Sequence, residues 1–568
     1  MSLLNKNEIQ KRVNAPFLNN PVTFEMVSQI LGWKNANQFY DRTKNYNVYH
    51  FLNAYKIQSK IEHSFNPTGL QKIPKSESLI VVANHPTGIP DGLLILDTLL
   101  SVRSDVKIVA NDFTYKVDPI KPYTFAVDPY NESDSAAKNS GQIRQILQWL
   151  NDGHCIILFP SGDVSGKNRL TKQIEEQPWN NTAKKILLKH KGTIIPWAIS
   201  GNNSNLFYQF ANIHPALKSA LLPREGMNRR KRPIFSQIGQ PLKLNGSLDA
   251  LSDLEIKIRL MSKVNGKSPR SPFQNIREKW RKNHKIMPLT PIIDPINSEL
   301  IKAEIQSLDS PISQKGDLEV FAFSAQNCPN LMMEIGRLRE RTFREVNEGT
   351  NLPYDIDSHD QHFTQLVLWD KQLNQVAGGY RMGFKQSAIL LEHYHPNQEM
   401  KQLLNQSVVL GRAFVVKEYQ AKPFPLFLLW QAIENILQKR SDVQYIVGQT
   451  SLPGTFHEIS KQLIVSYIEK NHSAHNFKTH FKAIHPFQSI DNTLIKSWIH
   501  QSSINDFKRL DSFISNIEPN GAKIPILFKR YIDQGAKFIG VNVDPNFNDS
   551  LDILMLTPIH KITIPKCG

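Results

Sequence analysis

Two polar side chains follow directly on a buried, β-branched run in LIVVANHPTGIPDG, residues 79–92. Pro86 and Pro90 prevent a strand from continuing, so His85 and Asp91 fall on a turn at the edge of a sheet. A carboxylate next to an imidazole fixes its tautomer and strengthens it as a base. The spacing therefore predicts a His–Asp pair that can deprotonate a hydroxyl, although turns also favour Asp and Pro for backbone reasons alone.

A second polar loop ends another buried run, in IILFPSGDVSGK at residues 156–167. It supplies Phe159, Pro160, Ser161, Gly162 and Asp163. A third apolar run with a similar polar end is TIIPWAISGNNSNLF. Strand ends of one parallel sheet share a crevice, so we expect both loops to meet the His–Asp turn.

A second group of ionisable side chains lies in the C-terminal half, in LRERTFREVNEGT and the following NLPYDIDSHDQH. Its members are Arg339, Phe343, Glu348, Asp355, Asp357 and Asp360, followed by Arg381 in GGYRMG and Arg412 in LGRAFV. Each residue alone suits a solvated helix face or a polar loop. The ordered set as a whole is less easily explained in that way.

The elements that must position these groups can be predicted from periodicity. Strand-like and helical stretches alternate between residues 78 and 245, which is the order of an α/β domain. After residue 316 the order is strand, helix, three successive strands, helix and strand, which predicts a mixed α+β domain. The fold class is therefore α/β, with two domains.

Composition sets the domain boundaries. Residues 264–315 are rich in Pro, Lys, Asn and Ser and predict a basic linker between domains over 65–263 and 316–568. Residues 1–64 are expected to be helical. Their apolar stripe of Val22, Met26, Ile30 and Trp33 either packs on its own domain or contacts a membrane surface.

Length, composition and net charge restrict the class of protein. A chain of 568 residues with 40% hydrophobic and 21% charged residues can form two globular cores. Its net charge of +17 indicates an anionic partner, which is nucleic acid, an anionic membrane or an acidic carrier protein. Cys155, Cys328 and Cys567 show no CxxC spacing, which favours a reducing cytoplasm over a disulfide or zinc framework. No signal peptide and no apolar run of about 18 residues is present, so we expect neither export nor a membrane span.

The turn and the two loops together resemble the glycerolipid acyltransferase family, over roughly residues 65–245. That family carries an NHxxxxD block, an FPEG block and a proline-ended strand in this order. The resemblance implies that His85 is the general base for a hydroxyl attacking an acyl thioester, that Asp91 orients it, and that residues 159–163 bind substrate.

Two departures from the family pattern refine the expectation. The spacing here is HxxxxxD, and Ser161 replaces the Glu of FPEG, although Asp163 can restore an acid nearby. The HxxxxxD spacing and the FPSGD block resemble those of a subgroup, the bifunctional ornithine lipid synthases. The acceptor in that subgroup is a hydroxyl on a fatty chain.

The C-terminal half, residues 316–550, resembles the branch of the GNAT superfamily that contains ornithine N-acyltransferases and acyl-homoserine lactone synthases. The resemblance implies an amine acylation site at Arg339, Phe343, Asp357, Asp360, Arg381 and Arg412. The family commonly has a Glu where Val409 stands, so Glu348, Asp357 and Asp360 remain alternatives for the base.

The donor, partners and location follow from the same resemblance. KEYQAKP replaces the RxxGxG loop of acetyl-CoA enzymes, so acyl carrier protein is the expected donor, with acyl-CoA as the alternative. The carrier protein would bind at Lys417, at Lys422 or at the basic run NRRKRP. That run equally suits a solvated loop or a contact with anionic lipid. We expect no cofactor and no metal, no nucleic-acid partner, and a peripheral position on the cytoplasmic face of the inner membrane.

The two resemblances fit one pathway. N-acylation of an amino acid, most simply ornithine, by a 3-hydroxyacyl chain would create the hydroxyl that the N-terminal domain then acylates. One alternative is a lysophospholipid acyltransferase with a non-catalytic GNAT-like domain. Another is a non-enzymatic binder of nucleic acid or membrane, which the charge alone suggests.

Overall fold

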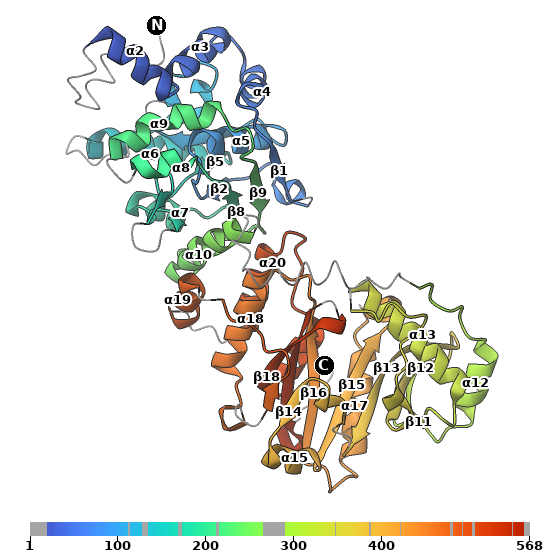
Figure 1. The fold of residues 1–568 in the computed structure, drawn as a ribbon. Helices are drawn as coiled ribbons and strands as arrows, with labels where there is room; N and C mark the ends of the chain where they lie inside the picture. The colour runs from blue at the N-terminus through green and yellow to red at the C-terminus, as the bar shows by residue number, and fades with distance from the viewer. Residues whose placement is uncertain are drawn as a thin grey trace. The chain divides into compact units, whose positions relative to one another are not determined.

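The computed structural model describes residues 20–561, except 67, 112–113, 128–134, 169–172, 212–214, 265–289, 347, 386–387, 421, 478–480, 491, 502–505 and 548. The chain divides into two compact units. The first comprises Met1–Arg270 with Ser512–Ala522, and the second comprises Ser271–Asp511 with Lys523–Gly568. Each unit contains its own large sheet covered by helices (Figure 1), which confirms the two-domain α/β expectation.

The first unit is built on a seven-stranded sheet in the order β1-β9-β8-β2-β5-β3-β4. Neighbouring strands are parallel except β8 and β9. The strands are β1 (His63–Phe65), β2 (Leu79–Ala83), β3 (Val106–Ala110), β4 (Thr124–Ala126), β5 (Cys155–Leu158), β8 (Thr193–Ser200) and β9 (Ile234–Ile238).

Strand β2 fixes where the His–Asp turn lies. All five of its side chains are fully buried, as its apolar sequence predicts. Val82 pairs with Leu158 of β5 on one side and with Pro196 of β8 on the other, so the three strand ends emerge at one edge. The Asn84 side chain then bonds the backbone of Ile199 through both its oxygen and its nitrogen, at 2.6 and 2.8 Å.

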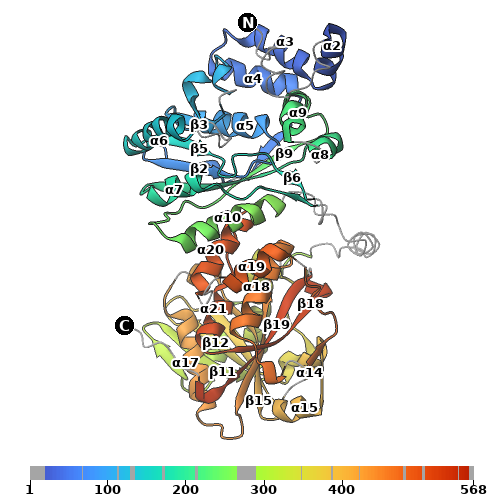
Figure 2. The same ribbon diagram turned by 90° about the vertical axis from the view of Figure 1, so that its left-hand side faces the viewer.

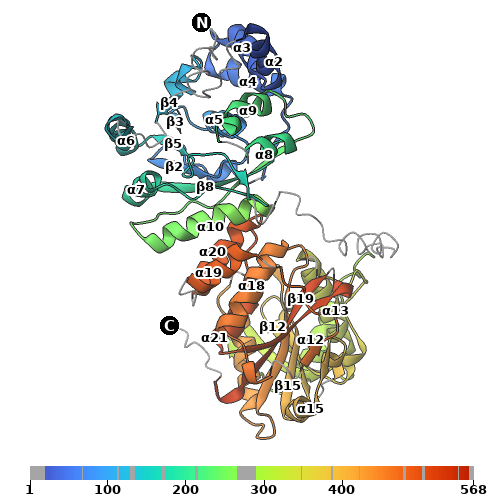
Figure 3. The ribbon, with the colours of Figure 1, turned by 60° about the vertical axis from the view of Figure 1, so that its left-hand side comes forward.

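Helices cover both faces of this sheet. Figures 2 and 3 show α4, α5 and α9 over one face, and α7 and α10 over the other. The helices of the unit are α2 (Pro21–Ile30), α3 (Trp33–Thr43), α4 (Val48–Ser59), α5 (Ile89–Leu100), α6 (Ser135–Asn151), α7 (Asn181–Lys189), α8 (Asn205–Ala211), α9 (Pro215–Met227) and α10 (Leu248–Val264). A short ribbon, β6 (Gly166–Lys167) with β7 (Ile174–Glu175), follows the second polar loop.

The N-terminal helices divide the expected apolar stripe between two faces. Phe24, Val27 and Leu31 pack around Trp33, whereas the side chains of Val22, Met26 and Ile30 point into solvent. Residues 1–19 of the expected segment lie outside the described residues. Within the described part of the chain, no helix is both long and apolar enough to cross a membrane.

The second unit is built on an eight-stranded sheet in the order β10-β11-β12-β13-β15-β16-β19-β18. All neighbours are antiparallel except β15 and β16, which are parallel. The strands are β10 (Ser313–Lys315), β11 (Leu318–Ser324), β12 (Thr364–Asp370), β13 (Gln375–Phe384), β15 (Ser407–Val415), β16 (Tyr445–Leu452), β18 (Lys537–Asp544) and β19 (Ser550–Pro558). Helix α13 (Pro329–Glu345) packs on β13 and β15, and α17 (Pro425–Leu437) packs across β10 to β13.

Part of the linker expected over 264–315 is folded in the structure. Residues 265–289 lie outside the described residues, but α12 (Ser298–Gln306) and β10 are part of the second unit. Ile301 and Ile305 of α12 are buried, and Glu304 accepts the backbone N–H groups of Asn330 and Leu331 at the start of α13. Composition indicated a linker because the stretch before this helix, with its Pro, Lys, Asn and Ser residues, dominates the average over 264–315.

Candidate active sites

The His–Asp turn of the first unit has the geometry that its sequence predicts. Nδ1 of His85 lies 3.0 Å from Oδ2 of Asp91, which is fully buried. The same carboxylate accepts the N–H groups of Thr87 and Gly88 at 2.8 and 3.0 Å, and the Thr87 hydroxyl donates to its other oxygen. Asp91 therefore closes the first turn of α5, and the same carboxylate lies against the imidazole.

Gly88 allows this tight turn. Its φ is +89°, a conformation that side chains with a Cβ rarely adopt. A Cβ there would also lie 2.7 Å from Leu222 Cδ2 on α9. The glycine keeps Asp91 within reach of the backbone that precedes it.

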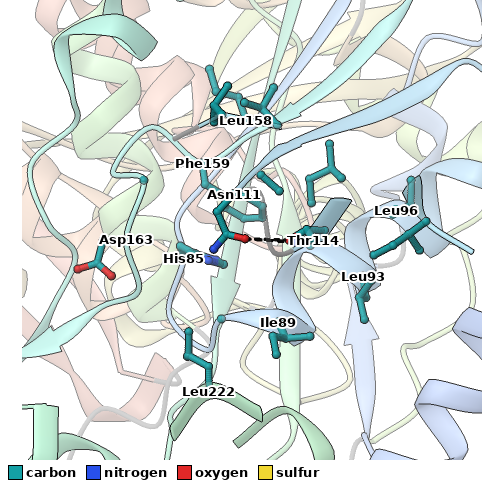
Figure 4. Close-up of a pocket in the computed structure, with 18 of the residues that line it drawn as sticks. His85, Ile89, Leu93, Leu96, Asn111, Thr114, Leu158, Phe159, Asp163 and Leu222 are labelled. Carbon is teal, nitrogen blue, oxygen red and sulfur yellow. Dashed lines mark hydrogen bonds between the residues drawn. The ribbon is translucent and has the colours of Figure 1, made fainter. Parts of the chain in front are cut away.

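The imidazole opens into a large apolar cavity (Figure 4). The His85 ring stacks on Phe159, with centroids 4.3 Å apart and planes inclined by 34°. The cavity measures about 870 Å³, and α5 lines it with Ile89, Leu93 and Leu96, while α3 and α4 add further aromatic and aliphatic side chains. The apolar part of this lining suits an acyl chain, and polar side chains such as Asn111 and Thr114 also border the cavity.

The second polar loop reaches the same cavity, as the strand order predicts. Phe159, Ser161, Gly162 and Asp163 line it, and the Pro160 carbonyl accepts the backbone N–H of Asn180 at 2.9 Å. Asp163, however, is half exposed and its carboxylate binds Lys218 Nζ at 2.6 Å. It is committed to an ion pair.

A different acid lies beside Ser161. The Glu176 side chain is 5% exposed and lies next to Ser161 and Trp179, with no hydrogen bond of ordinary geometry to either among the described residues. Burial raises the pKa of Glu176 to about 7, against the opposing charge of Arg259. Sequence spacing could not find this residue, because it precedes α7 and meets the loop only in the fold.

The basic run NRRKRP is not uniformly solvated. Arg230 and Lys231 are exposed, and Arg232 forms an ion pair with Glu225. Arg229 is 1% exposed, and its Nη1 donates to Asn203 Oδ1 at 3.0 Å. One member of an expected docking surface is thus an interior residue.

In the second unit, the expected site residues form a buried network of alternating charges. Arg339 donates to Asp360 Oδ1 at 2.8 Å, and Arg381 donates to both oxygens of Asp357 at 2.8 Å. Arg412 lies 3.3 Å from Asp355 Oδ1, and its guanidinium faces the Phe343 ring at 6.0 Å. Although burial opposes it, the charges of Arg339 and Arg381 lower the pKa of Asp360 to about 2.

Glu348 has a different environment from these aspartates. Its Oε2 accepts the Ser451 hydroxyl at 2.8 Å, and its Oε1 is buried with no hydrogen-bond partner among the described residues. Burial raises the pKa of Glu348, and the Ser451 hydrogen bond only partly offsets this. Val409, where the resembling family carries its acid, is 3% exposed and packs in an apolar cluster.

Asp552 stands directly opposite Ser451, on β19. Burial and the neighbouring Asp544 and Glu348 raise its pKa well above the usual range. With His393 and Asp544 it places three potential metal-ligand atoms within 4.8 Å of one another. Sequence reasoning missed this residue because nothing in β19 marks it.

The parallel pair β15 and β16 separates next to these groups. Pairing runs from Ser407 with Tyr445 to Leu410 with Gly448, although β15 continues to Val415. Arg412 has a φ of +50°, and β13 is bulged opposite it. Beyond Leu410, the edge of β15 that faces β16 has no pairing partner in the described ladder. Backbone N–H groups of this kind can hold a thioester oxyanion.

Comparisons with known proteins identify the two kinds of domain. Residues 49–264 match a family described as Acyltransferase, and residues 338–431 match one described as Acetyltransferase (GNAT) domain. The protein is therefore an acyltransferase, with an acyltransferase domain followed by a GNAT domain.

Two curated relatives are similar to this chain. A glycine N(alpha)-acyltransferase of Bacteroides thetaiotaomicron is 27% identical over 48% of this chain and 88% of its own length. A lyso-glycine lipid O-acyltransferase of Phocaeicola vulgatus is 26% identical over 38% of this chain and 77% of its own. Among solved structures, the loading GNATL domain of CurA from Lyngbya majuscula is 14% identical, covering 43% of this chain and 99% of its own, with a TM-score of 0.24, too low to carry an argument.

Proposed function

We propose that the chain makes a diacylated aminolipid in two steps. The second unit joins a 3-hydroxyacyl chain to the amino group of an amino acid, and the first unit adds a second acyl group to the 3-hydroxyl of that product. The observation that carries the proposal is His85, held by Asp91 at the wall of an apolar cavity, on a chain that also carries a GNAT domain. N-acylation and O-acylation are named for separate proteins among the relatives.

The O-acylation step assigns one role to each residue of the turn. Nε2 of His85 takes the proton of the acceptor hydroxyl while the hydroxyl oxygen attacks the thioester carbon. Asp91, 3.0 Å from Nδ1, stabilises the imidazolium that forms. When the carbon–sulfur bond breaks, the leaving thiolate takes that proton, and the base is restored. The cavity would hold an acyl chain beside this centre.

The N-acylation step needs a base for the ammonium proton of the amino acid. We assign it to Glu348, because Asp357 and Asp360 are each bound to an arginine, whereas Oε1 of Glu348 has no partner among the described residues. The neutral amine then attacks the thioester carbon, and the N–H groups of β15 beyond Leu410 would hold the oxyanion. As the amide forms, the carbon–sulfur bond breaks and the thiolate leaves with the second proton of the nitrogen, while Glu348 returns its own proton to solvent. The acidic loop after α13, which carries Asp355, Asp357 and Asp360, borders this site. Its carboxylates form ion pairs with Arg412, Arg381 and Arg339, which hold the loop in place.

We assign glycine as the amino acid, because both relatives carry glycine in their names. Ornithine, expected from the sequence, remains the alternative. The proposed donor is acyl carrier protein, whose acidic surface would meet exposed basic residues such as Lys417, Arg230 and Lys231. Acyl transfer from carrier-bound and CoA-bound chains, compared at equal concentration, decides the donor.

The proposed location is the surface of an anionic membrane. The exposed side chains of Val22, Met26 and Ile30 lie at successive turns of α2, on the face opposite Trp33. Replacing all three by Ser should reduce sedimentation with phosphatidylglycerol vesicles. Leu248→Ser, at an exposed leucine of α10, is the matched control. Equal binding by the triple variant would exclude α2 as the contact.

The function is tested by expression in a bacterium that lacks aminolipids, with mass spectrometry of total lipids. The wild-type chain should yield a diacylated aminolipid whose mass identifies the amino acid. His85→Ala should yield the monoacylated 3-hydroxy amide instead, while His50→Ala, at an exposed histidine of α4, should resemble wild type. If no aminolipid appears and phospholipid chains change in a His85-dependent way, the chain is a lysophospholipid acyltransferase instead.

A further inference from the structure

Arg229 is an interior cation for which the proposed mechanism has no use. Its side chain is 1% exposed, and it forms no ion pair within 4 Å among the described residues. Nη1 is bonded to Asn203, but Nε and Nη2 are buried without hydrogen-bond partners in the described part of the chain. A buried charge left in this way is costly, so its retention requires a compensating interaction.

The geometry shows where that interaction lies. The backbone N–H of Arg229 is fixed to Ser59 at the end of α4, at 2.7 Å. A Cβ built on Gly201, just past β8, would lie 3.1 Å from Thr87 Cγ2 and 3.7 Å from Arg229 Nη2. The guanidinium and the His–Asp turn therefore meet at the same backbone position. Thr87 is the residue whose N–H and hydroxyl both bind Asp91.

The other charged and titratable groups around the guanidinium are already engaged. Glu225 of α9 accepts the backbone and hydroxyl of Ser204 and pairs with Arg232. Tyr55 of α4 donates to the Gly226 carbonyl, and Tyr208 of α8 accepts the N–H of Asn203. Burial raises the pKa of both tyrosines, to about 12 for Tyr208, so both are neutral near pH 7. The remaining anion is Asp91, whose charge interacts with that of Arg229.

We propose that Arg229 is a positioning residue of the O-acylation site, whose buried positive charge offsets the negative charge of Asp91 and so leaves His85 able to accept a proton. The inference rests on the proposed function of His85. An ionised carboxylate 3.0 Å from Nδ1 favours the imidazolium, which cannot act as a base. A cation near the carboxylate reduces that preference while leaving the Asp91 hydrogen bonds in place.

The test measures His85 directly, without substrate. In the full-length chain labelled with ¹³C at histidine Cε1, the His85 signal is assigned by its loss in His85→Gln and titrated by NMR. Arg229→Gln and Arg229→Met should move the midpoint to higher pH by roughly one unit, since the offsetting charge is gone. Arg229→Lys keeps the charge and should move it by much less. Lys60→Gln, at an exposed residue next to Ser59, should leave it unchanged.

Two results would overturn the inference. Either an unmoved midpoint in a folded neutral variant, or an equal shift in Arg229→Lys, would mean that the charge of Arg229 does not act on His85. Both neutral variants, Arg229→Gln and Arg229→Met, are made so that the titration can still be measured if one of them misfolds.

Kinetics with N-(3-hydroxyacyl)glycine then separate the two proposals. A shifted titration without any wild-type O-acylation would contradict the proposed function alone, and a raised KM for the acceptor with an unmoved midpoint would make Arg229 a substrate-binding residue.

Discussion

The Glu348 carboxylate accepts the Ser451 hydroxyl at 2.8 Å, which joins the loop after α13 to strand β16, where the parallel pair separates. Burial keeps the pKa of Glu348 above its usual range. A base with a raised pKa is protonated at low pH and becomes competent only as the pH rises through that pKa. N-acylation should therefore increase with pH on the acid side of its profile.

Glu348→Gln tests this role. We expect N-acylation to fall by roughly 10²-fold or more, the usual contribution of a general base, and the acid limb of kcat/KM to disappear. Ser451→Ala removes the only hydrogen bond described for this carboxylate and should move the limb to higher pH without abolishing activity. If Glu348→Gln keeps the wild-type rate and the acid limb of the kcat/KM profile, the base is Asp552 instead.

Asp91→Asn should affect both the rate and the stability of the first unit. Oδ2 of Asp91 faces the Thr87 and Gly88 N–H groups and the imidazole, whereas Oδ1 accepts the Thr87 hydroxyl. An amide nitrogen would replace one of these two oxygens, and neither arrangement reproduces the charged carboxylate. We expect O-acylation to fall by roughly 10²-fold or more, and the free energy of unfolding by about 1 kcal/mol from the weakened helix cap. Denaturant unfolding and thiol release measure the two effects. A loss of rate alone would mean that the cap tolerates the amide.

The cavity predicts chain-length selection. Leu96 is fully buried in α5 and lines the cavity. Leu96→Phe should shorten the available space, so the O-linked chain of the product should become shorter while the amide-linked chain is unchanged. Mass spectrometry with fragmentation distinguishes the two positions. Ala303→Val on α12 of the second unit is a control that should change neither chain.

Asp360 predicts how the second unit responds to acid. Its pKa is about 2 in the folded chain against an ordinary 3.8, so it contributes stability that is present above pH 3.8 and lost as the pH falls through 2. The contribution is about 2 kcal/mol. Asp360→Asn leaves Arg339 with a weaker partner and should lower the free energy of unfolding at pH 7. The difference from wild type should shrink between pH 4 and pH 2, and a constant difference would contradict the ion-pair explanation.

Local sequence predicted more of the fold than of the sites. The buried run of β2, the prolines after it and the His–Asp spacing specify the His–Asp turn without reference to distant residues. The surroundings of Asp163 and of the basic run could not be predicted for the opposite reason. Whether Asp163 meets Lys218, or whether Arg229 is buried beside Asn203, depends on pairings of residues far apart in sequence. A basic residue among other basic residues carries no signal of burial.

The acidic loop shows the same limit. Its residues were expected to form an amine-acylation site, and the structure ties Asp357 and Asp360 to arginines from α13 and β13. Residue types alone do not tell a committed ion pair from a base that awaits a proton. The distinction needs the partner of each oxygen, which only the fold supplies. Asp552 was missed because its neighbour across the sheet, Ser451, comes from a distant strand.

Both units lie on one continuous chain. Under the proposed function, translation therefore delivers the two activities in equal numbers, whatever the strength of the promoter. The intermediate would be a single-chain amphiphile, which acts as a detergent when it accumulates. Separate genes must match their expression to keep such a compound scarce, whereas this chain fixes the ratio in its covalent structure.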